Sequence, residues 1–398
     1  MEKEGSLLGG VLLIAGSCIG AGMLALPVIT GISGFAPSMV MFVLAWLFMT
    51  LTGFLVLEVN LALGYRFSLI SLVQKTLGRV GKALCWVLFL FLFYSLSVAY
   101  ISASGSIIQS MTGFAPWVGS VLFSLLFSIV LYIGVKQVDY LNRLLMVGLI
   151  ISYCILVFLG SQHVHLDYLK MQNWKYSFAA LPILIISFGF HNMIPSLAMY
   201  MKGNVRKLRL TLLIGSLIPL GIYFIWQAVM LGILPLADVQ SALDNGDVAT
   251  SALQAVIGKG WINTVAQFFA LFAITTSFLA QSLSLVDFLS DGLKIAKVGI
   301  RRVGLIIATI IPPLLFAFLN PGIFIKALSM AGGLSAVILF GVMPALMVWK
   351  LRLKNQQKNA SLLPGGHLLL SSLLVVALGI FCLEIAGELG FTLIPHQG

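Results

Sequence analysis

Long apolar stretches recur along almost the whole chain, and this feature restricts the fold more than any other. Each stretch has about 18 residues or more, which is enough for an α-helix to cross a hydrocarbon core of about 30 Å. Of the 398 residues, 60% are hydrophobic and 9% are charged, whereas soluble globular proteins carry about 25% charged residues. A transmembrane β-barrel would show alternating segments of about ten residues instead. The sequence therefore predicts an all-α integral membrane protein.

The apolar stretches predict eleven membrane spans within a single transmembrane domain, residues 1–398. The expected spans are residues 6–31, 36–63, 83–110, 117–135, 142–161, 177–201, 209–234, 261–289, 303–319, 324–349 and 366–386. The start of the first span resembles a signal peptide, because residues 7–15 are apolar and small residues follow them. Glu2 and Glu4 precede this run, however, and its hydrophobicity continues well past the cleavage position. We therefore expect a retained span.

Basic residues are distributed unevenly between the expected loops, and this bias predicts the orientation of the chain. With a cytoplasmic N-terminus, all but four of the 23 Lys and Arg residues lie at the cytoplasmic ends of spans. The net charge of +11 therefore reflects membrane topology, and we expect no nucleic-acid partner. Residues 64–82 predict a short amphipathic helix on the cytoplasmic face. Residues 235–260 form the longest external connection, which is interpreted either as a lid or as a solvated connector.

The first span is interrupted at residues 16–27, which read GSCIGAGMLALP. Each glycine costs a helix interior about 1 kcal/mol relative to alanine, and lipid cannot satisfy backbone groups that an unwound turn releases. Such a gap persists only where protein or a polar cavity covers it. The N–H groups that start the second half-helix then attract an anion, and the carbonyls that end the first half attract a cation.

The sixth span carries a matching interruption at residues 187–196, SFGFHNMIPS, in which Pro195 removes a backbone donor and disfavours a continuous helix. The first and sixth spans are five crossings apart, an odd number, so the second copy runs in the opposite sense. We expect an inverted repeat of residues 6–161 and 177–349, followed by an extra helix at residues 366–386. Paired breaks in two halves indicate a transporter binding site. The alternative is that glycine and proline merely allow close helix packing.

The stretches IGAGMLALP and SFGFHNMIPS together resemble the bacterial hydroxy- and aromatic-amino-acid permeases, and within them the tyrosine/tryptophan-specific permeases. The resemblance extends over essentially the whole chain. It implies a five-plus-five inverted repeat of the leucine-transporter type with broken helices 1 and 6. It also implies a multi-pass protein of the bacterial cytoplasmic (inner) membrane.

The resemblance implies a secondary active symporter that imports aromatic amino acids, tyrosine first and tryptophan next, driven by a cation gradient that is commonly one of protons. Three alternatives stay open: sodium coupling, a hydroxy- or branched-chain amino acid as substrate, and a passive channel or facilitator. The expected partners are therefore a small-molecule amino acid and the lipid bilayer.

Residues at the two breaks are the candidates for substrate binding, because a zwitterionic amino acid presents one anionic and one cationic group. For the carboxylate we expect the backbone at Gly20, Ala21, Gly22 and Met23. For the ammonium we expect unwound carbonyls near Ser17, Ser187 and Phe188. Phe188 and Phe190 flank the second break and are expected to offer aromatic faces to the substrate, with bundle packing as the alternative.

His191, which Asn192 follows in the second break, is the one histidine expected at mid-membrane. Ionisable residues at that depth are functional candidates, and an imidazole titrates near physiological pH. We expect His191 to hydrogen-bond the substrate or to take part in proton coupling. The alternative is a neutral histidine whose partner is a backbone carbonyl freed at the break.

The eighth span contains a spacing, Ala-x-x-Thr-Ser, that resembles the sodium site of leucine-transporter-fold proteins. Carried over, the ligands are the carbonyls of Gly16, Ile19 and Ala273 and the hydroxyls of Thr276 and Ser277. All are neutral oxygens, which suit a hard monovalent cation. Threonine and serine also join helices in membranes by hydrogen bonds, and we expect H⁺ rather than Na⁺ as the coupling ion.

Three acidic residues in or near spans are possible proton carriers: Glu58, Asp287 and Glu384. Glu58 is the preferred relay candidate. For Glu58 and Asp287, which lie near cytoplasmic ends, the alternative is an ion pair with a basic residue of a nearby loop.

The sequence carries no enzyme signature. Its glycine pairs lack the strand–loop–helix setting and the lysine of a phosphate loop. No Cys/His cluster has zinc-ligand spacing, and the four cysteines all fall within expected spans. We therefore expect no catalysis, no cofactor, no firm metal site and no ATPase subunit.

Overall fold

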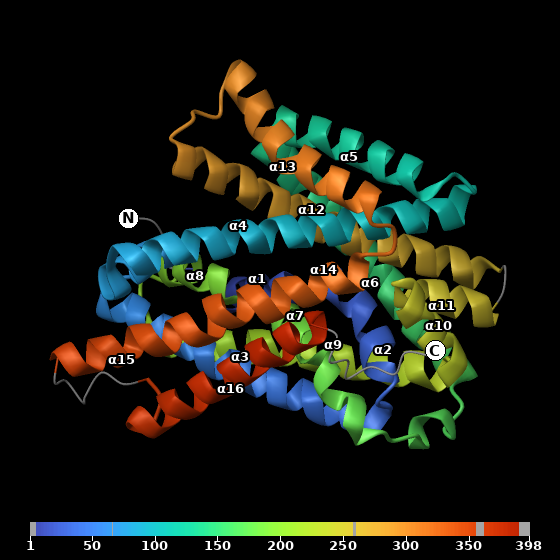
Figure 1. Cartoon of the computed structure of the whole chain (residues 1–398), viewed down its shortest axis with the longest axis horizontal. Coiled ribbons are helices and arrows are strands. Elements are labelled where there is room, and N and C mark those ends of the chain that lie inside the picture. The colour runs from blue at the N-terminus through green and yellow to red at the C-terminus, as the bar shows by residue number, and fades with distance from the viewer. Residues whose placement is uncertain (1–4, 66, 258–259, 356–361, 390–398) are drawn as a thin grey trace.

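The computed structural model describes residues 5–65, 67–257, 260–355 and 362–389. This part of the chain consists of helices joined by short loops, and it contains no β-strand (Figure 1). Ten of its helical segments are each long and apolar enough to cross a membrane. The pair α1 (Leu7–Cys18) and α2 (Gly22–Gly31), which bends by 52°, makes an eleventh span. The predicted all-α membrane protein with eleven spans is confirmed.

Most spans are single helices. They are α3 (Phe35–Ala62), α4 (Leu69–Thr112), α5 (Pro116–Ile133), α6 (Val135–Gly160), α9 (Val205–Ile233), α12 (Trp261–Leu293), α13 (Gly299–Leu319) and α16 (Gly366–Glu388). The last turns of α15 (Met343–Asn355) and the start of α4 lie at one end of the molecule, which we call the α15 end. The helix α10 (Leu236–Asn245) lies at the other end, which we call the α10 end (Figure 1).

Both predicted breaks are present. Residues 19–21 separate α1 from α2 in the first span. In the sixth span, η3 (Trp174–Ala180) leads into α7 (Leu181–Ser187), and η4 (His191–Met193) precedes α8 (Ile194–Tyr200). Pro195 stands at the second position of α8, where the missing N–H would have had no helical partner. The proline therefore starts the second half-helix rather than kinking a continuous one.

The tenth span contains a feature that the sequence did not predict. Between α14 (Phe324–Met330) and α15, residues Ala331–Val342 form a π-helix; such wide turns are rare and are found frequently at functional sites. Two glycines lie in it at close approaches. A Cβ atom on Gly332 would collide with the Pro182 carbonyl of α7, and one on Gly333 would lie 2.7 Å from carbons of Glu384 on α16.

The expected amphipathic helix at residues 64–82 begins at Leu69 and is the first part of α4. Its apolar face, which includes Leu72 and Val73, is buried. Gly78, with φ of 85°, separates it from the membrane span, because this left-handed backbone favours glycine. The helix is thus shorter than predicted and joins the third span directly.

The expected loop at residues 235–260 folds as α10 followed by α11 (Ala249–Ile257), which cover the α10 end. Val239 of α10 is buried close to Gly31, at the end of α2. The segment is therefore a packed helical cap rather than an open connector, and its action as a lid stays a prediction.

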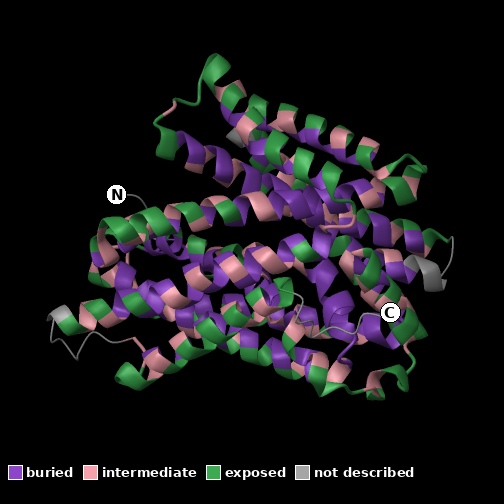
Figure 2. Ribbon diagram, in the orientation of Figure 1, coloured by how far each residue is buried: buried purple, intermediate pink, exposed green. Residues whose placement is uncertain are grey.

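Burial identifies the centre of the bundle. The buried residues concentrate in the broken spans, in α12 and in the tenth span, whereas α5, α6, α13 and α16 expose much of their surface (Figure 2). After the first break, all nine residues from Met23 to Gly31 are buried, so α2 is covered by protein over nearly its whole length. The two breaks therefore lie where the fold covers them with protein, as an unwound turn in a membrane requires.

Candidate functional site

The two breaks lie against each other at the centre of the bundle. A Cβ atom on Gly22 would be 2.7 Å from Ser187 Oγ, and one on Gly20 would collide with Ser277 Oγ of α12. The Ala21 N–H donates a hydrogen bond of 3.0 Å to the same Ser277 hydroxyl. Glycine at positions 20 and 22 thus permits three spans to meet without intervening side chains.

Tyr223 of α9 joins the two breaks. Its hydroxyl lies 2.7 Å from the carbonyl oxygen of Cys18 and 3.0 Å from that of Ser187, which are the last residues of α1 and α7. The side chain is fully buried. Because a phenol has one proton, it donates to these two carbonyls alternately or shares the proton between them. Both carbonyl-ended half-helices are therefore held by a single donor.

A second residue of α9 holds the start of α2. The indole Nε1 of Trp226 donates a 3.0 Å hydrogen bond to the Met23 carbonyl, one helical turn beyond Tyr223. Neither side chain was predicted from the sequence. The available signal was a pair of aromatic residues with polar tips, three positions apart in a span, since such tips need partners when buried.

At the head of α2, some backbone N–H groups have hydrogen-bond acceptors and two do not. The Met23 N–H donates to the Gly20 carbonyl at 3.1 Å, and the Ala21 N–H is bound to Ser277. Within the described part of the chain, the N–H groups of Gly20 and Gly22 have no hydrogen-bond acceptor. Free N–H groups at the positive end of a helix are suited to bind an anion.

A cavity of about 180 Å³ borders the breaks. Among the predicted site residues, it is lined by Gly16, Ser17, Ile19, Asn192, Thr276 and Ser277. Other walls were not foreseen: they include the aromatic rings of Phe89, Phe93 and Tyr100 on α4 and of Phe340 in the π-helix. The cavity thus combines hydroxyl and amide groups with aromatic faces.

The lining also shows where the cavity leads. Phe89, Asn142 and Ser284 lie in the halves of α4, α6 and α12 that are nearer the α15 end, because α4 and α6 begin there and α12 finishes there. The cavity therefore extends from the breaks toward the α15 end, while α10 and α11 cover the other end.

Phe188 and Phe190, expected as aromatic faces of the site, are fully buried and lie outside the cavity lining. The Phe188 ring packs edge-on against Tyr223 at a centroid distance of 5.3 Å. The Phe190 ring stacks on His191 at 5.1 Å. In this conformation, rings from α4 and the π-helix face the cavity in their place.

His191 is fully buried behind the cavity wall, stacked against Phe340 at a centroid distance of 4.8 Å and an interplanar angle of 13°. Its Nε2 lies 2.9 Å from Thr52 Oγ1. The Thr52 hydroxyl donates to carbonyls of its own helix, so we assign Nε2–H as the donor to Thr52. Nδ1 then carries a lone pair that has no partner among the described residues. The partner of His191 is thus a threonine, not the freed backbone carbonyl considered above.

The structure brings the expected cation ligands to one place. Gly16, Ile19, Thr276 and Ser277 line the same cavity, and the Ala273 carbonyl lies beside Gly20. The Thr276 hydroxyl donates to carbonyls of its own helix, and Ser277 accepts the Ala21 N–H. Each hydroxyl oxygen keeps a lone pair, so the donor set fits a monovalent cation, with Ser277 shared between that cation and the backbone.

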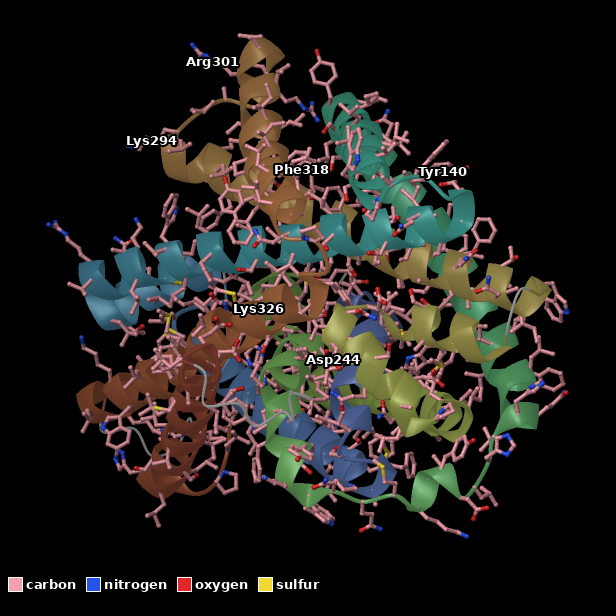
Figure 3. All side chains as sticks on the ribbon, turned by 45° about the vertical axis from the view of Figure 1, so that its right-hand side comes forward. Tyr140, Asp244, Lys294, Arg301, Phe318 and Lys326 are labelled. Carbon is pink, nitrogen blue, oxygen red and sulfur yellow. The ribbon has the colours of Figure 1, made fainter. Side chains whose placement is uncertain are left out.

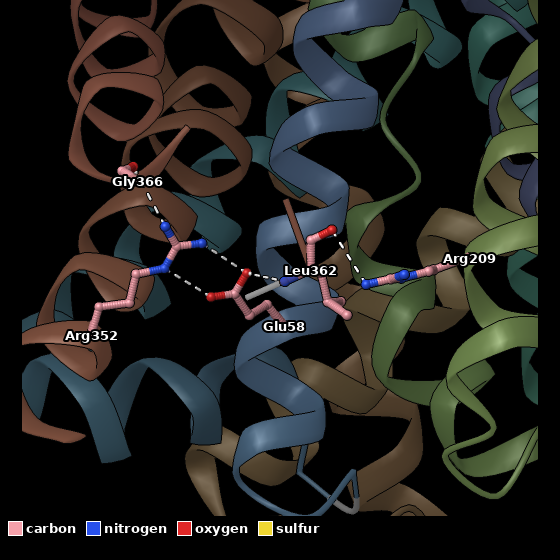
Figure 4. A network of polar contacts seen from close by, with 5 residues as sticks. All are labelled: Glu58, Arg209, Arg352, Leu362 and Gly366. Carbon is pink, nitrogen blue, oxygen red and sulfur yellow. Dashed lines mark hydrogen bonds and ion pairs between the residues drawn. The ribbon is translucent and has the colours of Figure 1, made fainter. Parts of the chain in front are cut away.

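Glu58 lies outside the cavity lining and forms a bidentate ion pair with Arg352 (Figure 4), with Nε–Oε1 and Nη2–Oε2 distances of 3.0 Å. The Leu362 N–H also donates to Oε2 at 3.0 Å. Arg209 donates to the Leu362 carbonyl at 3.4 Å, and Arg352 donates to the Gly366 carbonyl at 3.4 Å. This Glu58 network joins α3, α9, α15 and the start of α16 at the α15 end.

Asp287 likewise pairs with Lys297 of the following loop at 2.8 Å. For both acids the structure therefore shows the basic partner that the alternative interpretation anticipated. The central cavity and the two breaks contain neither of them.

A model of the tryptophan/tyrosine permease family matches residues 3–385 of the chain. The "Tyrosine-specific transport system 1" of Haemophilus influenzae is 32% identical over 394 residues, covering 96% of this chain and 98% of the relative. The "Tryptophan-specific transport protein" of the same organism is 29% identical over 411 residues, covering 98% of each. The "Low affinity tryptophan permease" of Escherichia coli K12 is 30% identical over 387 residues, covering 92% of each.

Each match extends over nearly the full length of this chain and of the relative, so it includes both broken spans. The matches confirm the resemblance drawn from the two motifs. Because the matched proteins are transport proteins, they also confirm the prediction of a transporter rather than an enzyme.

Proposed function

This chain belongs to the tryptophan/tyrosine permease family, and we propose that it imports tyrosine or tryptophan across the bacterial inner membrane by proton symport. The observation that carries the proposal is the meeting of both helix breaks beside a cavity lined with aromatic rings. The relatives named for tyrosine and tryptophan transport support the substrate class.

In this proposal the breaks recognise the amino-acid backbone and the cavity recognises the side chain. The N–H groups of Gly20 and Gly22 bind the carboxylate, since they are the backbone donors left without an acceptor. The ammonium binds near Ser17 and the carbonyls that end α1 and α7. Phe89, Phe93 and Phe340 supply the aromatic walls for the ring.

We place the N-terminus in the cytoplasm, because the basic residues gather at the α15 end. The cavity then opens to the cytoplasm, and α10 and α11 close the external side. This arrangement corresponds to an inward-facing conformation. Transport requires a second conformation that opens the α10 end, reached by rearrangement of the two proposed five-helix repeats, residues 6–161 and 177–349.

For the coupling ion, the contacts support protons and point to His191. Ser277, a ligand of the expected sodium site, would have to bind sodium with the one lone pair that the Ala21 N–H leaves. Glu58 is engaged by Arg352 at a distance from the breaks. His191 combines burial beside the second break with an unpartnered Nδ1, so it can accept a proton when rearrangement brings it into contact with water.

The test is uptake of labelled tyrosine and tryptophan into proteoliposomes, with pH and sodium gradients imposed separately. We expect accumulation above equilibrium under an inward proton gradient, competition by aromatic amino acids, and none by serine or leucine. Accumulation that needs sodium would move the coupling to Thr276 and Ser277. Equilibration without any gradient would identify a facilitator and refute symport.

A further inference from the structure

A second cavity, of about 690 Å³, lies near the α10 end. Its volume falls within the range of about 300–1,000 Å³ typical of small-molecule sites. It shares no lining residue with the central cavity. The walls come from α2, the start of the sixth span, the end of α10, α14 and the end of α16. Since α2 and α7 also form the breaks, they stand between the two cavities.

Two polar contacts between α14 and α16 line this outer cavity. Ser329 Oγ donates to Glu384 Oε2 at 2.8 Å, and Lys326 Nζ lies 3.0 Å from Glu388 Oε2. Lys326 and Ser329 are three positions apart on α14, and Glu384 and Glu388 are four apart on α16. The two contacts therefore lie one helical turn from each other along the same pair of helices. The Ser329 contact is deep, and the Lys326 contact is at the rim.

Glu384 is unusual because it is only 8% exposed and has a neutral partner. A buried carboxylate is costly unless it is paired and hydrogen-bonded. Ser329 satisfies Oε2, whereas Oε1 has no hydrogen-bond partner among the described residues. The close approach of Gly333 to its side chain fixes the carboxylate against the cavity wall. Glu384 therefore offers a fixed acceptor to a positively charged group in the cavity.

The charge of the lining also favours a cation. Three carboxylates, those of Asp244, Glu384 and Glu388, face the cavity together with one ammonium, that of Lys326. Asp244 and Lys326 are labelled in Figure 3, where they lie on the side of the molecule that comes forward. The Lys326 and Glu388 side chains are 59% and 35% exposed, so their pair is weak and can exchange with a ligand.

The remaining walls are apolar and include Ile29, Phe178, Pro182, Ile325 and Leu383. A ligand that matches this lining has one ammonium, one carboxylate and an apolar body. We propose that the outer cavity is a second amino-acid site, with Glu384 binding the ammonium and Lys326 the carboxylate. The proposal rests on the proposed function and adds a place where the substrate is held before it reaches the breaks.

The experiment counts binding sites on the full-length protein purified in detergent. Labelled tryptophan and labelled tyrosine are titrated separately to millimolar concentration by a scintillation proximity assay. We expect two sites per chain in the wild type. Glu384→Gln and Lys326→Gln each weaken one site by about ten- to a hundredfold, the usual effect of removing a charged hydrogen-bond partner, and leave the other unchanged. Asp287→Asn is the matched control, because it removes an ion-paired carboxylate far from the cavity, and it should retain two sites.

One site in the wild type, unaffected by either substitution, would overturn the outer site and leave the proposed function standing. No binding of either amino acid in the wild type would refute the proposed function itself. Should Glu384→Gln abolish both sites through misfolding, Lys326→Gln decides the matter, since its side chain is mostly exposed. Loss of one site in that variant supports the proposal, and loss of none overturns it.

Discussion

Replacing Tyr223 by phenylalanine tests whether the joined breaks set substrate affinity. The substitution keeps the ring that packs against Phe188 and removes only the hydroxyl between the Cys18 and Ser187 carbonyls. One proton serves both carbonyls, so the loss counts as one hydrogen bond. Removing a partner from a buried polar group costs about 1–3 kcal/mol. If the substitution destabilises the conformation that binds substrate by this amount relative to other conformations, the apparent KM for uptake rises about 5- to 150-fold.

The chain offers a matched control in Tyr153 of α6. Its hydroxyl also donates to a backbone carbonyl of α9, that of Ile222, at 3.0 Å, and its ring packs beside Trp226 at 6.1 Å. Tyr153→Phe therefore removes the same kind of bond, but its acceptor is a carbonyl within α9 rather than a carbonyl at either break. We expect a modest loss of thermal stability and an unchanged KM.

The assay is concentration-dependent uptake into proteoliposomes, with reconstituted protein quantified and thermal unfolding measured in parallel. Two outcomes would contradict a role of Tyr223 in substrate affinity: a KM of Tyr223→Phe within twofold of the wild type, or an equal rise of KM in both variants. Either result would show that Tyr223 only packs between helices.

Three further substitutions test the site and the Glu58 network. Gly22→Leu should abolish uptake while the protein still inserts into the membrane, because a side chain there would collide with the second break; normal uptake would contradict the site. Ser277→Ala should raise KM about tenfold through loss of the acceptor for the Ala21 N–H, and an accompanying loss of sodium dependence would indicate sodium coupling. Glu58→Gln should lower stability by about 1–3 kcal/mol, because Arg352 loses its bidentate partner, and should leave the pH profile of uptake unchanged; a shifted profile would restore Glu58 as a relay.

The spans and both breaks could be predicted because their signals are local. An apolar run has a length that either does or does not cross a bilayer, and the glycines of the first break and Pro195 of the second act on the backbone within one turn. The family motifs lie at these same positions. The neutral oxygens around Thr276 were found for the same reason, since a short spacing on one helix carried the resemblance.

The side-chain environment could not be predicted, because it depends on how helices rotate against one another. Phe188 and Phe190 are adjacent to the break in sequence, yet the local backbone turns both rings into the bundle. Phe340 of the tenth span lines the cavity and lies in a π-helix, which no local sequence pattern predicted. Tyr223 is one of ten tyrosines, and only its position between two carbonyls distinguishes it. The partner of Glu58 is 294 residues away in the chain.

The Glu58 network restricts how the molecule can move. It joins the ends of α3, α9 and α15 to the segment that starts α16, at the α15 end (Figure 4). Any movement that separates α3 from α15 there would first have to break the bidentate ion pair between Glu58 and Arg352. Because α3 belongs to one proposed repeat and α9 and α15 to the other, this network would resist any rearrangement that separates the two repeats at the α15 end.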